Sequence, residues 1–192
     1  MTSWLTERDL RRLHKQGAKY YPAEAKLTPA ARDFARRLQL SAGSTASPAV
    51  IALACDHGGF QLKESLKKSL IKAGYKIQDL GCHSADSVDY PDYAAAVGKQ
   101  VVCGKAGFGI MIDTYGTASA IAANKINGVR AAFCPSIEIA VSARSHNDAN
   151  VLTLGGKMDR NEAEQIALAF LKEPFQGGRH LRRVEKIQAL ER

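Results

Sequence analysis

The 192-residue sequence lacks the long apolar runs of a membrane-spanning chain. Its longest runs, such as Val50 to Cys55 and Ile110 to Ile112, fall far short of the roughly 20 residues that cross a bilayer. The charged stretch from Thr6 to Lys15 begins so early that no apolar region of a signal peptide fits before it. We therefore expect a protein without a membrane span that stays in the cytoplasm.

Closely spaced cysteines are absent as well. The four cysteines, at positions 55, 82, 103 and 134, form no C-x-x-C pair, and no His/Cys cluster has zinc-ligand spacing. Reduced thiols in a cytosol are the simplest interpretation. We expect neither a metal ion nor a cofactor.

Aromatic residues are few, at 7%, although the net charge is +8. Residues 1–50 hold nine basic and four acidic side chains, so +5 of the charge lies in the first quarter of the chain. A nucleic-acid surface more often places its basic stripe on the folded domain, with aromatics interleaved. The composition therefore disfavours nucleic acid as a partner and leaves an anionic metabolite.

A small, polar run at residues 41–48 has the composition of a flexible linker and divides the chain. Residues 1–40 are expected to form a helical extension, because two short helices bury too little to fold as a domain. Residues 49–192 are long enough for one α/β domain.

Two helices are predicted in the extension. Thr6 can cap a helix that carries Leu10 and Leu13, and Thr28 followed by Pro29 is typical of the start of a second helix. Two interpretations remain for this extension. It docks on another protein through a face formed by Leu10 and Leu13 of an amphipathic helix, or it packs as a cap on its own domain.

After the linker, buried strands alternate with helices. The run from Ala49 to Cys55 is followed by a helical pattern of Leu62, Leu66 and Leu70 that ends at Gly74. Five such units predict a flavodoxin-like, doubly wound, five-stranded parallel sheet whose ligands bind beyond the carboxyl ends of the strands. The other strands are expected at 76–80, 108–113, 129–133 and 151–154, and the other helices near 92–103, 117–125, 136–145, 161–172 and 179–190.

Polar residues follow two of these strands. Asp56 and His57 precede two glycines that let a backbone approach a ligand, and a helix N-terminus that favours an anion. The alternative is that Asp56 only caps the helix and His57 is a turn residue. Asp113 likewise is either a general base or a cap for the next helix, and capping is the better expectation from position alone.

Two further groups lie near strand starts or the chain end. His146 and Asn147 stand just before the fifth strand. Arg179 and Arg183 are spaced i, i+4 on one helix face, which suits a phosphate but is more often a solvated surface. Together, these groups and the residues after the strands supply an anion-binding site, a base and an acid.

The chain resembles the type B ribose-5-phosphate isomerase and galactose-6-phosphate isomerase family from about residue 50 to 190. The resemblance rests on motifs in the same order: Asp56-His57-Gly58-Gly59-Phe60, Ser87 to Tyr93, Ile121 to Lys125, Gly128 to Ala131, His146 to Leu152 and Gly177-Gly178-Arg179-His180.

The resemblance implies a flavodoxin-like dimer, or a tetramer built from it, with active sites at subunit interfaces. It implies metal-free aldose–ketose isomerisation of a sugar phosphate, with ribose 5-phosphate and ribulose 5-phosphate as the expected pair. By residue, it implies phosphate binding by His57, Arg179 and Arg183, ring opening by His146, and sugar contacts by Asp56, Tyr90, Gly116 and Asn147.

One departure from the family pattern concerns the base. Many members have Cys-Gly-Thr-Gly after the third strand, with the cysteine as base and the turn N–H groups facing an enediolate; another branch has a glutamate at the position of Ser119. Here the stretch reads Asp113-Thr114-Tyr115-Gly116. Asp113 is chemically adequate as the base, and Tyr115 is expected to narrow the sugar pocket.

The sequence therefore favours a sugar-phosphate isomerase with Asp113 and His146 as catalytic residues. The competing hypothesis is a non-catalytic or altered member that binds sugar phosphate after losing its base. Residues 6–13 and 27–33 also resemble N-terminal segments of bacterial microcompartment enzymes, which implies a shell or cargo partner for the extension.

Overall fold

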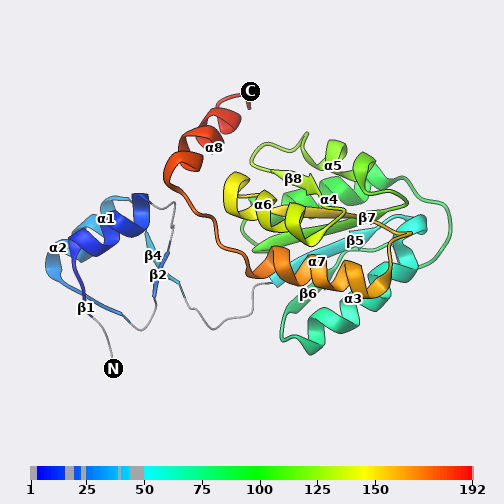
Figure 1. Ribbon diagram of the computed structural model, residues 1–192, viewed down its shortest axis with the longest axis horizontal. Helices are drawn as coiled ribbons and strands as arrows, with labels where there is room; N and C mark the ends of the chain where they lie inside the picture. Colours follow the sequence, from blue (N-terminus) through cyan, green and yellow to red (C-terminus); the bar gives the residue numbers. More distant parts are fainter. Residues whose placement is uncertain (1–3, 16–19, 23–24, 39, 44–49, 192) are drawn as a thin grey trace.

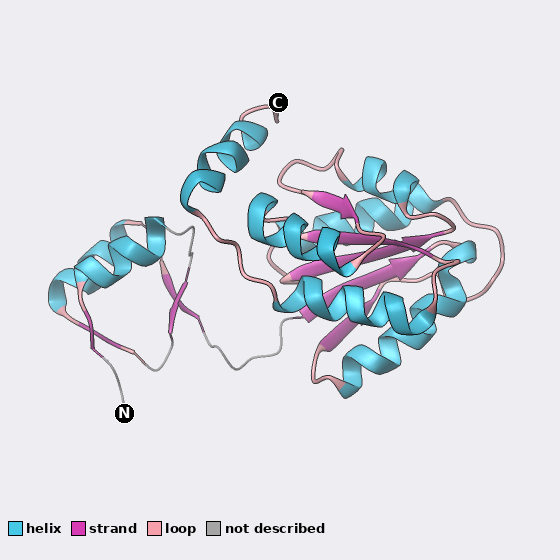
Figure 2. Ribbon diagram, viewed as in Figure 1, coloured by secondary structure: helices cyan, strands magenta, loops and turns pink. Residues whose placement is uncertain are grey.

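The structure is a computed structural model that describes residues 4–15, 20–22, 25–38, 40–43 and 50–191. It contains two structural units, the N-terminal elements and a five-stranded α/β domain (Figures 1 and 2). The predicted fold class is confirmed for the second unit. Its strands are β5 (Val50–Cys55), β6 (Lys76–Asp79), β7 (Phe108–Asp113), β8 (Ala131–Phe133) and β9 (Val151–Gly155), and all their pairings are parallel.

Helices cover both faces of this sheet because its central strands are apolar on both sides. One core cluster joins alternate strand residues such as Leu53 and Ile110 to three helices, and the other joins Ala52 and Met111 to two. The helices of the first face are α3 (Phe60–Lys72), α6 (Ile137–Asn147) and α7 (Arg160–Lys172), and those of the second are α4 (Tyr90–Val102) and α5 (Thr117–Ala123).

The strand order is β6-β5-β7-β9-β8. Numbered along this sheet alone, that is 2-1-3-5-4, whereas flavodoxin itself has 2-1-3-4-5. The last strand, β9, inserts beside β7, and the N–H of Gly156 donates to the carbonyl of Asp113 over 2.7 Å. This order brings the turn after β9 directly against the turn after β7.

Element boundaries differ from the expected ones by a few residues. Helix α4 begins at Tyr90 rather than 92, because Asp89 has extended backbone and Pro91 fits the first turn. Strand β8 begins at Ala131 rather than 129, because the N–H of Val129 closes a turn onto Ile126. The predicted last helix is split into η2 (Gly178–His180) and α8 (Leu181–Gln188).

The N-terminal unit has its own small core. Its helices are α1 (Glu7–Lys15) and α2 (Pro29–Arg37), with both predicted caps confirmed, since Thr6 accepts from the Asp9 N–H and Thr28 from the Ala31 N–H. Its strands pair in twos, β1 (Trp4–Leu5) with β3 (Lys26–Leu27), and β2 (Tyr20–Pro22) with β4 (Ser41–Gly43).

Two expectations for this unit need correction. Leu10 is fully buried against α2 in a cluster with Leu27 and Phe34, so it is not an exposed docking contact. The Leu13 side chain lies outside the described part of the structure. The expected linker loses residues 41–43 to strand β4, and residues 44–48 lie outside the described residues.

Within the described ranges, no helix has the length and hydropathy needed to cross a membrane.

We predict that the α/β domain folds without the extension. Among the described residues, the two sheet clusters contain none before 50, and the N-terminal cluster contains none after 40. Deleting residues 1–45 should therefore leave one cooperative thermal transition close to that of the full chain. As a control that disrupts the sheet core, Leu53→Ala should lower the free energy of unfolding in urea by about 2–5 kcal/mol. Aggregation of the truncated chain would identify the extension as a structural cap.

Candidate active site

Three turns converge at the carboxyl edge of the sheet, after β5, β7 and β9. A Cβ atom on Gly156 would collide with the carbonyl of Gly58, and one on Gly59 would collide with the backbone of Ile112. Glycine is needed at these positions because the backbones touch directly. The sequence places Asp56, His57 and Asp113 at this edge, and the structure brings their turns together.

Asp56 and His57 open the first turn. Asp56 is buried, and its Oδ1 accepts from the Gly59 N–H at 2.9 Å, so the predicted capping role is confirmed. His57 is exposed, and its Nδ1 accepts from the Val88 N–H at 3.3 Å. A neutral imidazole that accepts at Nδ1 carries its proton on Nε2, so His57 offers that N–H as a donor at the sheet edge.

Asp113 at the end of β7 is 4% exposed, and its carboxylate is held by its own turn. Oδ1 accepts from the N–H groups of Tyr115 and Gly116, and Oδ2 accepts from the Ser119 N–H at 2.8 Å. The capping role weighed for Asp113 is thus confirmed. Both lone pairs of Oδ1 are used, whereas Oδ2 keeps room for one more hydrogen bond.

Thr114 and Tyr115 replace the small residues of the family turn. The Thr114 hydroxyl occupies the space beside Gly58. Tyr115 is 65% exposed, and its hydroxyl accepts from Lys157 Nζ at 2.9 Å, a hydrogen bond that lowers the pKa of the phenol. Both residues line a hollow of about 270 Å³ together with Lys157 and Glu162.

Tyr90 and Gly116 also lie at the carboxyl edge, whereas His146, Asn147 and Arg179 lie at the amino edge. His146 and Asn147 end α6, just before β9 begins at Val151. The Nε of Arg130, which precedes β8, donates to the Asn147 carbonyl at 3.2 Å. Arg179 is attached to this group through its neighbour His180, whose ring stacks on His146.

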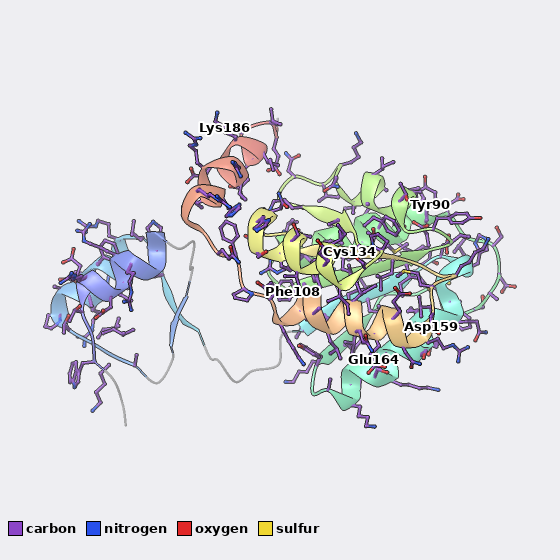
Figure 3. All side chains as sticks on the ribbon, in the orientation of Figure 1. Tyr90, Phe108, Cys134, Asp159, Glu164 and Lys186 are labelled. Carbon is purple, nitrogen blue, oxygen red and sulfur yellow. The ribbon has the colours of Figure 1, made fainter. Side chains whose placement is uncertain are left out.

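One chain does not bring the two groups of predicted residues together. Tyr90 lies at the carboxyl edge of the sheet and Phe108 lies at the amino edge. Figure 3 shows these two labelled residues at opposite ends of the sheet. Because β7 has six residues, the two edges are separated by roughly 20 Å. His57 therefore does not share a phosphate with Arg179 and Arg183 of the same chain.

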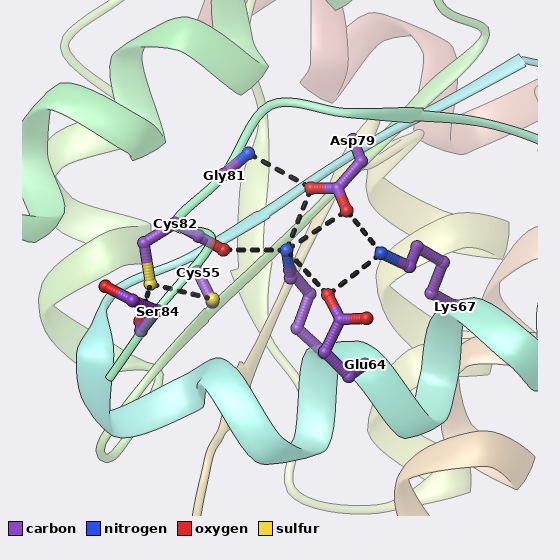
Figure 4. A network of polar contacts seen from close by, with 8 residues as sticks. Cys55, Glu64, Lys67, Asp79, Gly81, Cys82 and Ser84 are labelled. Atoms are coloured by element: carbon purple, nitrogen blue, oxygen red, sulfur yellow. Dashed lines mark hydrogen bonds and ion pairs between the residues drawn. The ribbon is translucent and has the colours of Figure 1, made fainter. Parts of the chain in front are cut away.

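A buried lysine anchors the loop after β6 to helix α3, and its burial was not predicted from the sequence. Lys63 on α3 is 0% exposed, and its Nζ contacts the Asp79 carboxylate at 2.9 Å, Glu64 at 3.0 Å and the Cys82 carbonyl at 2.8 Å (Figure 4). Burial opposes its charge, but the hydrogen bonds to Asp79 and Glu64 outweigh burial and raise the Lys63 pKa. Lys63 follows the Asp56 motif in the sequence, but nothing in the sequence indicated that its ammonium is buried.

The three buried cysteines are poorly suited to replace the base that the family resemblance implies. Cys55 and Cys82 are buried with their sulfur atoms 3.5 Å apart, and burial raises the pKa of Cys55 strongly. Burial likewise raises the pKa of Cys134 to about 12. Among the described residues, no group of three or more His, Cys, Asp or Glu side chains is placed to hold a metal ion.

Comparison with known proteins gives consistent matches. A family model described as ribose/galactose isomerase matches residues 51–187. The ribose-5-phosphate isomerase B of Escherichia coli K12 is 42% identical over 142 residues, which cover 73% of this chain and 95% of that protein.

Solved structures agree with the sequence relatives. A ribose 5-phosphate isomerase from Thermotoga maritima is 44% identical with a TM-score of 0.72, covering 73% of this chain and 98% of the other. Ribose-5-phosphate isomerase B from Clostridium thermocellum is 43% identical with a TM-score of 0.73, covering 74% and 97%. The matched region is the α/β domain.

We predict that Asp79→Asn destabilises the domain. Burial disfavours the Asp79 charge, but hydrogen bonds from Lys67, Lys63 and the Gly81 N–H hold its pKa at about 2. Removing the charge leaves the Lys63 cation short of a partner, at a cost of about 3 kcal/mol at pH 7 in urea unfolding.

The pH dependence of the free energy of unfolding also tests this prediction. A lowered carboxyl pKa stabilises the fold above the unfolded value of 3.8, and the stabilisation is lost as the pH falls toward 2. The difference in the free energy of unfolding between the parent and Asp79→Asn should therefore shrink over that pH range. Asp86→Asn, an exposed carboxylate of the β6–α4 loop, is the matched control. Equal stability of parent and Asp79→Asn at pH 7 would contradict the role given to the pair.

Proposed function

The chain belongs to the ribose/galactose isomerase family, and on that premise we propose that it is an aldose–ketose isomerase that interconverts ribose 5-phosphate and ribulose 5-phosphate. The observation that carries the proposal is the match of nearly the whole α/β domain to proteins named ribose-5-phosphate isomerase B. The polar groups at both sheet edges support it, because they offer the donors and the base that such a substrate needs.

The proposed reaction moves one proton between adjacent carbons. A base removes the proton from C2 of the open-chain aldose and returns it to C1, while the hydroxyl proton passes from O2 to O1 through an enediolate. Asp113 Oδ2 is the proposed base, because Oδ1 has both lone pairs engaged by backbone N–H groups. His146 assists ring opening before this step.

We propose that each active site combines two copies of the chain. His57, Asp113 and their turns at the carboxyl edge of one copy would meet Asn147 and Arg179 at the amino edge of the other. A groove of about 860 Å³ supports this arrangement, since Asn147 and Arg130 line it together with Ile187 of α8. A twofold dimer would then hold two identical sites.

A second candidate is a sugar-phosphate binding protein without turnover. The specific observation in its favour is that the turn amides, which the family resemblance directs at an enediolate, are occupied by Asp113 of the same chain. Such a protein would keep the phosphate donors but would leave the enediolate without those N–H groups.

A docking or targeting role for the N-terminal unit, including one in a bacterial microcompartment, stays a prediction. Exposed side chains of this unit would have to supply the contacts, because Leu10 is buried. Trp4 is 62% exposed, with the Lys26 ammonium over its ring.

We predict that Asp113→Asn lowers turnover of ribose 5-phosphate at least about a hundredfold, the usual scale for losing a general base. The asparagine keeps the Oδ1 acceptor, but its amide N–H points toward the Ser119 N–H, so the turn itself could change. Affinity for inorganic phosphate is therefore measured as the control. Unchanged phosphate affinity shows that the turn survives. Full turnover in the variant would exclude Asp113 as the base, and a parent that binds every sugar phosphate tested without converting any would favour the binding protein.

We predict that two inactive variants complement each other. Asp113→Asn disables the carboxyl edge and Arg179→Ala the amino edge, so a mixed dimer has one site with both defects and one with none. Refolding the two variants together in equal amounts should restore about a quarter of parent turnover by random pairing. Separately refolded variants mixed only in the assay are the control. Without recovery after joint refolding, the shared-site proposal fails.

A further inference from the structure

Two histidines stack at the amino edge of the sheet. The rings of His146 on α6 and His180 at the end of η2 have centroids 4.3 Å apart and are within 5° of parallel. His146 Nδ1 also lies 3.3 Å from the Ser142 hydroxyl, one turn earlier on α6. The position of the His146 ring is thus set from two sides.

His180 makes a second contact, to the proposed phosphate-binding arginine. Its Nε2 accepts from Arg179 Nε–H at 3.4 Å, which requires an unprotonated nitrogen. His180 is only 7% exposed, and burial together with the nearby His146, Arg179 and Arg183 lowers its pKa. A neutral imidazole at neutral pH matches the acceptor role.

We propose that His180 is a positioning residue, whose ring orients His146 for ring opening and whose Nε2 orients Arg179 for phosphate. The inference rests on the proposed function, in which His146 and Arg179 face one sugar phosphate. His180 itself touches neither the reacting carbons nor the base at the other edge.

The charges around the stack explain why one ring must stay neutral. His180 faces His146 on α6, Arg179 beside it in η2 and Arg183 on α8, all of which are cationic or can become so. The acidic residue nearest to His146 in sequence, Asp148, is paired with Arg130 and Arg144. Two stacked imidazolium ions would repel each other, so a neutral His180 leaves His146 free to carry the single proton that ring opening moves.

Two variants separate the two contacts. His180→Phe keeps an aromatic ring over His146 but loses the acceptor for Arg179, and should weaken inorganic phosphate binding about three- to tenfold. His180→Gln keeps an amide oxygen near the position of Nε2 as acceptor but loses the ring. It should remove the ring-current shift of the His146 Hε1 resonance in NMR, a shift that His180→Phe retains.

Activity distinguishes ring opening from proton transfer. Ribulose 5-phosphate has an open chain, so deuterium exchange from solvent into its C1 tests enolisation without ring opening. In His180→Gln this exchange should stay within about twofold of the parent, while net conversion of ribose 5-phosphate falls at least about tenfold, the lower end of acid–base effects. His14→Ala, an exposed histidine of α1, is the control and identifies an unrelated NMR signal.

The pH profile adds a readout that a purely structural role would not change. As the pH falls and His180 gains a proton, the acceptor for Arg179 is lost, so phosphate affinity of the parent should fall more steeply than that of His180→Phe. Parallel profiles, or an unchanged His146 resonance in His180→Gln, would overturn the positioning role. Failure of the proposed function differs, because a parent without exchange at C1 would still show the stacked-ring NMR shift.

Discussion

The Lys63 ammonium is the contact on which the geometry of the carboxyl edge depends. A cation removed from water costs several kcal/mol unless partners surround it, and here Asp79, Glu64 and the Cys82 carbonyl do so. These partners belong to three segments: helix α3, strand β6 and the loop after β6. The ion network therefore fixes where that loop runs, and the loop in turn supplies the Val88 N–H that holds His57.

A parallel sheet imposes the second constraint. Every strand ends at the same edge, so residues after strands and residues before strands are kept a full strand length apart. His57 and Asp113 follow strands, whereas Asn147 precedes one. A ligand the size of a pentose phosphate cannot reach both groups in one chain, and this constraint makes the association of two copies part of the proposed chemistry.

The alternation of apolar runs and helical patterns was sufficient to predict five strands and the class of sheet. It could not predict that β9 lies between β7 and β8, because strand order depends on packing of distant segments. The burial of Lys63 was missed because a lysine after Leu62 has the pattern of an ordinary helix surface. Asp113 was found by position, but only the turn geometry shows which of its oxygens remains available. Leu10 was misjudged because its partners on α2 are some twenty residues away.

The account is tested most directly by proton NMR of ribose 5-phosphate with the full-length protein in D₂O. An isomerase with Asp113 as base must remove the C2 proton, so the account predicts loss of the C2 proton signal and growth of ribulose 5-phosphate signals, both abolished in Asp113→Asn. A C2 signal that persists while ribose 5-phosphate raises the thermal midpoint of the protein would contradict the account and identify a binding protein.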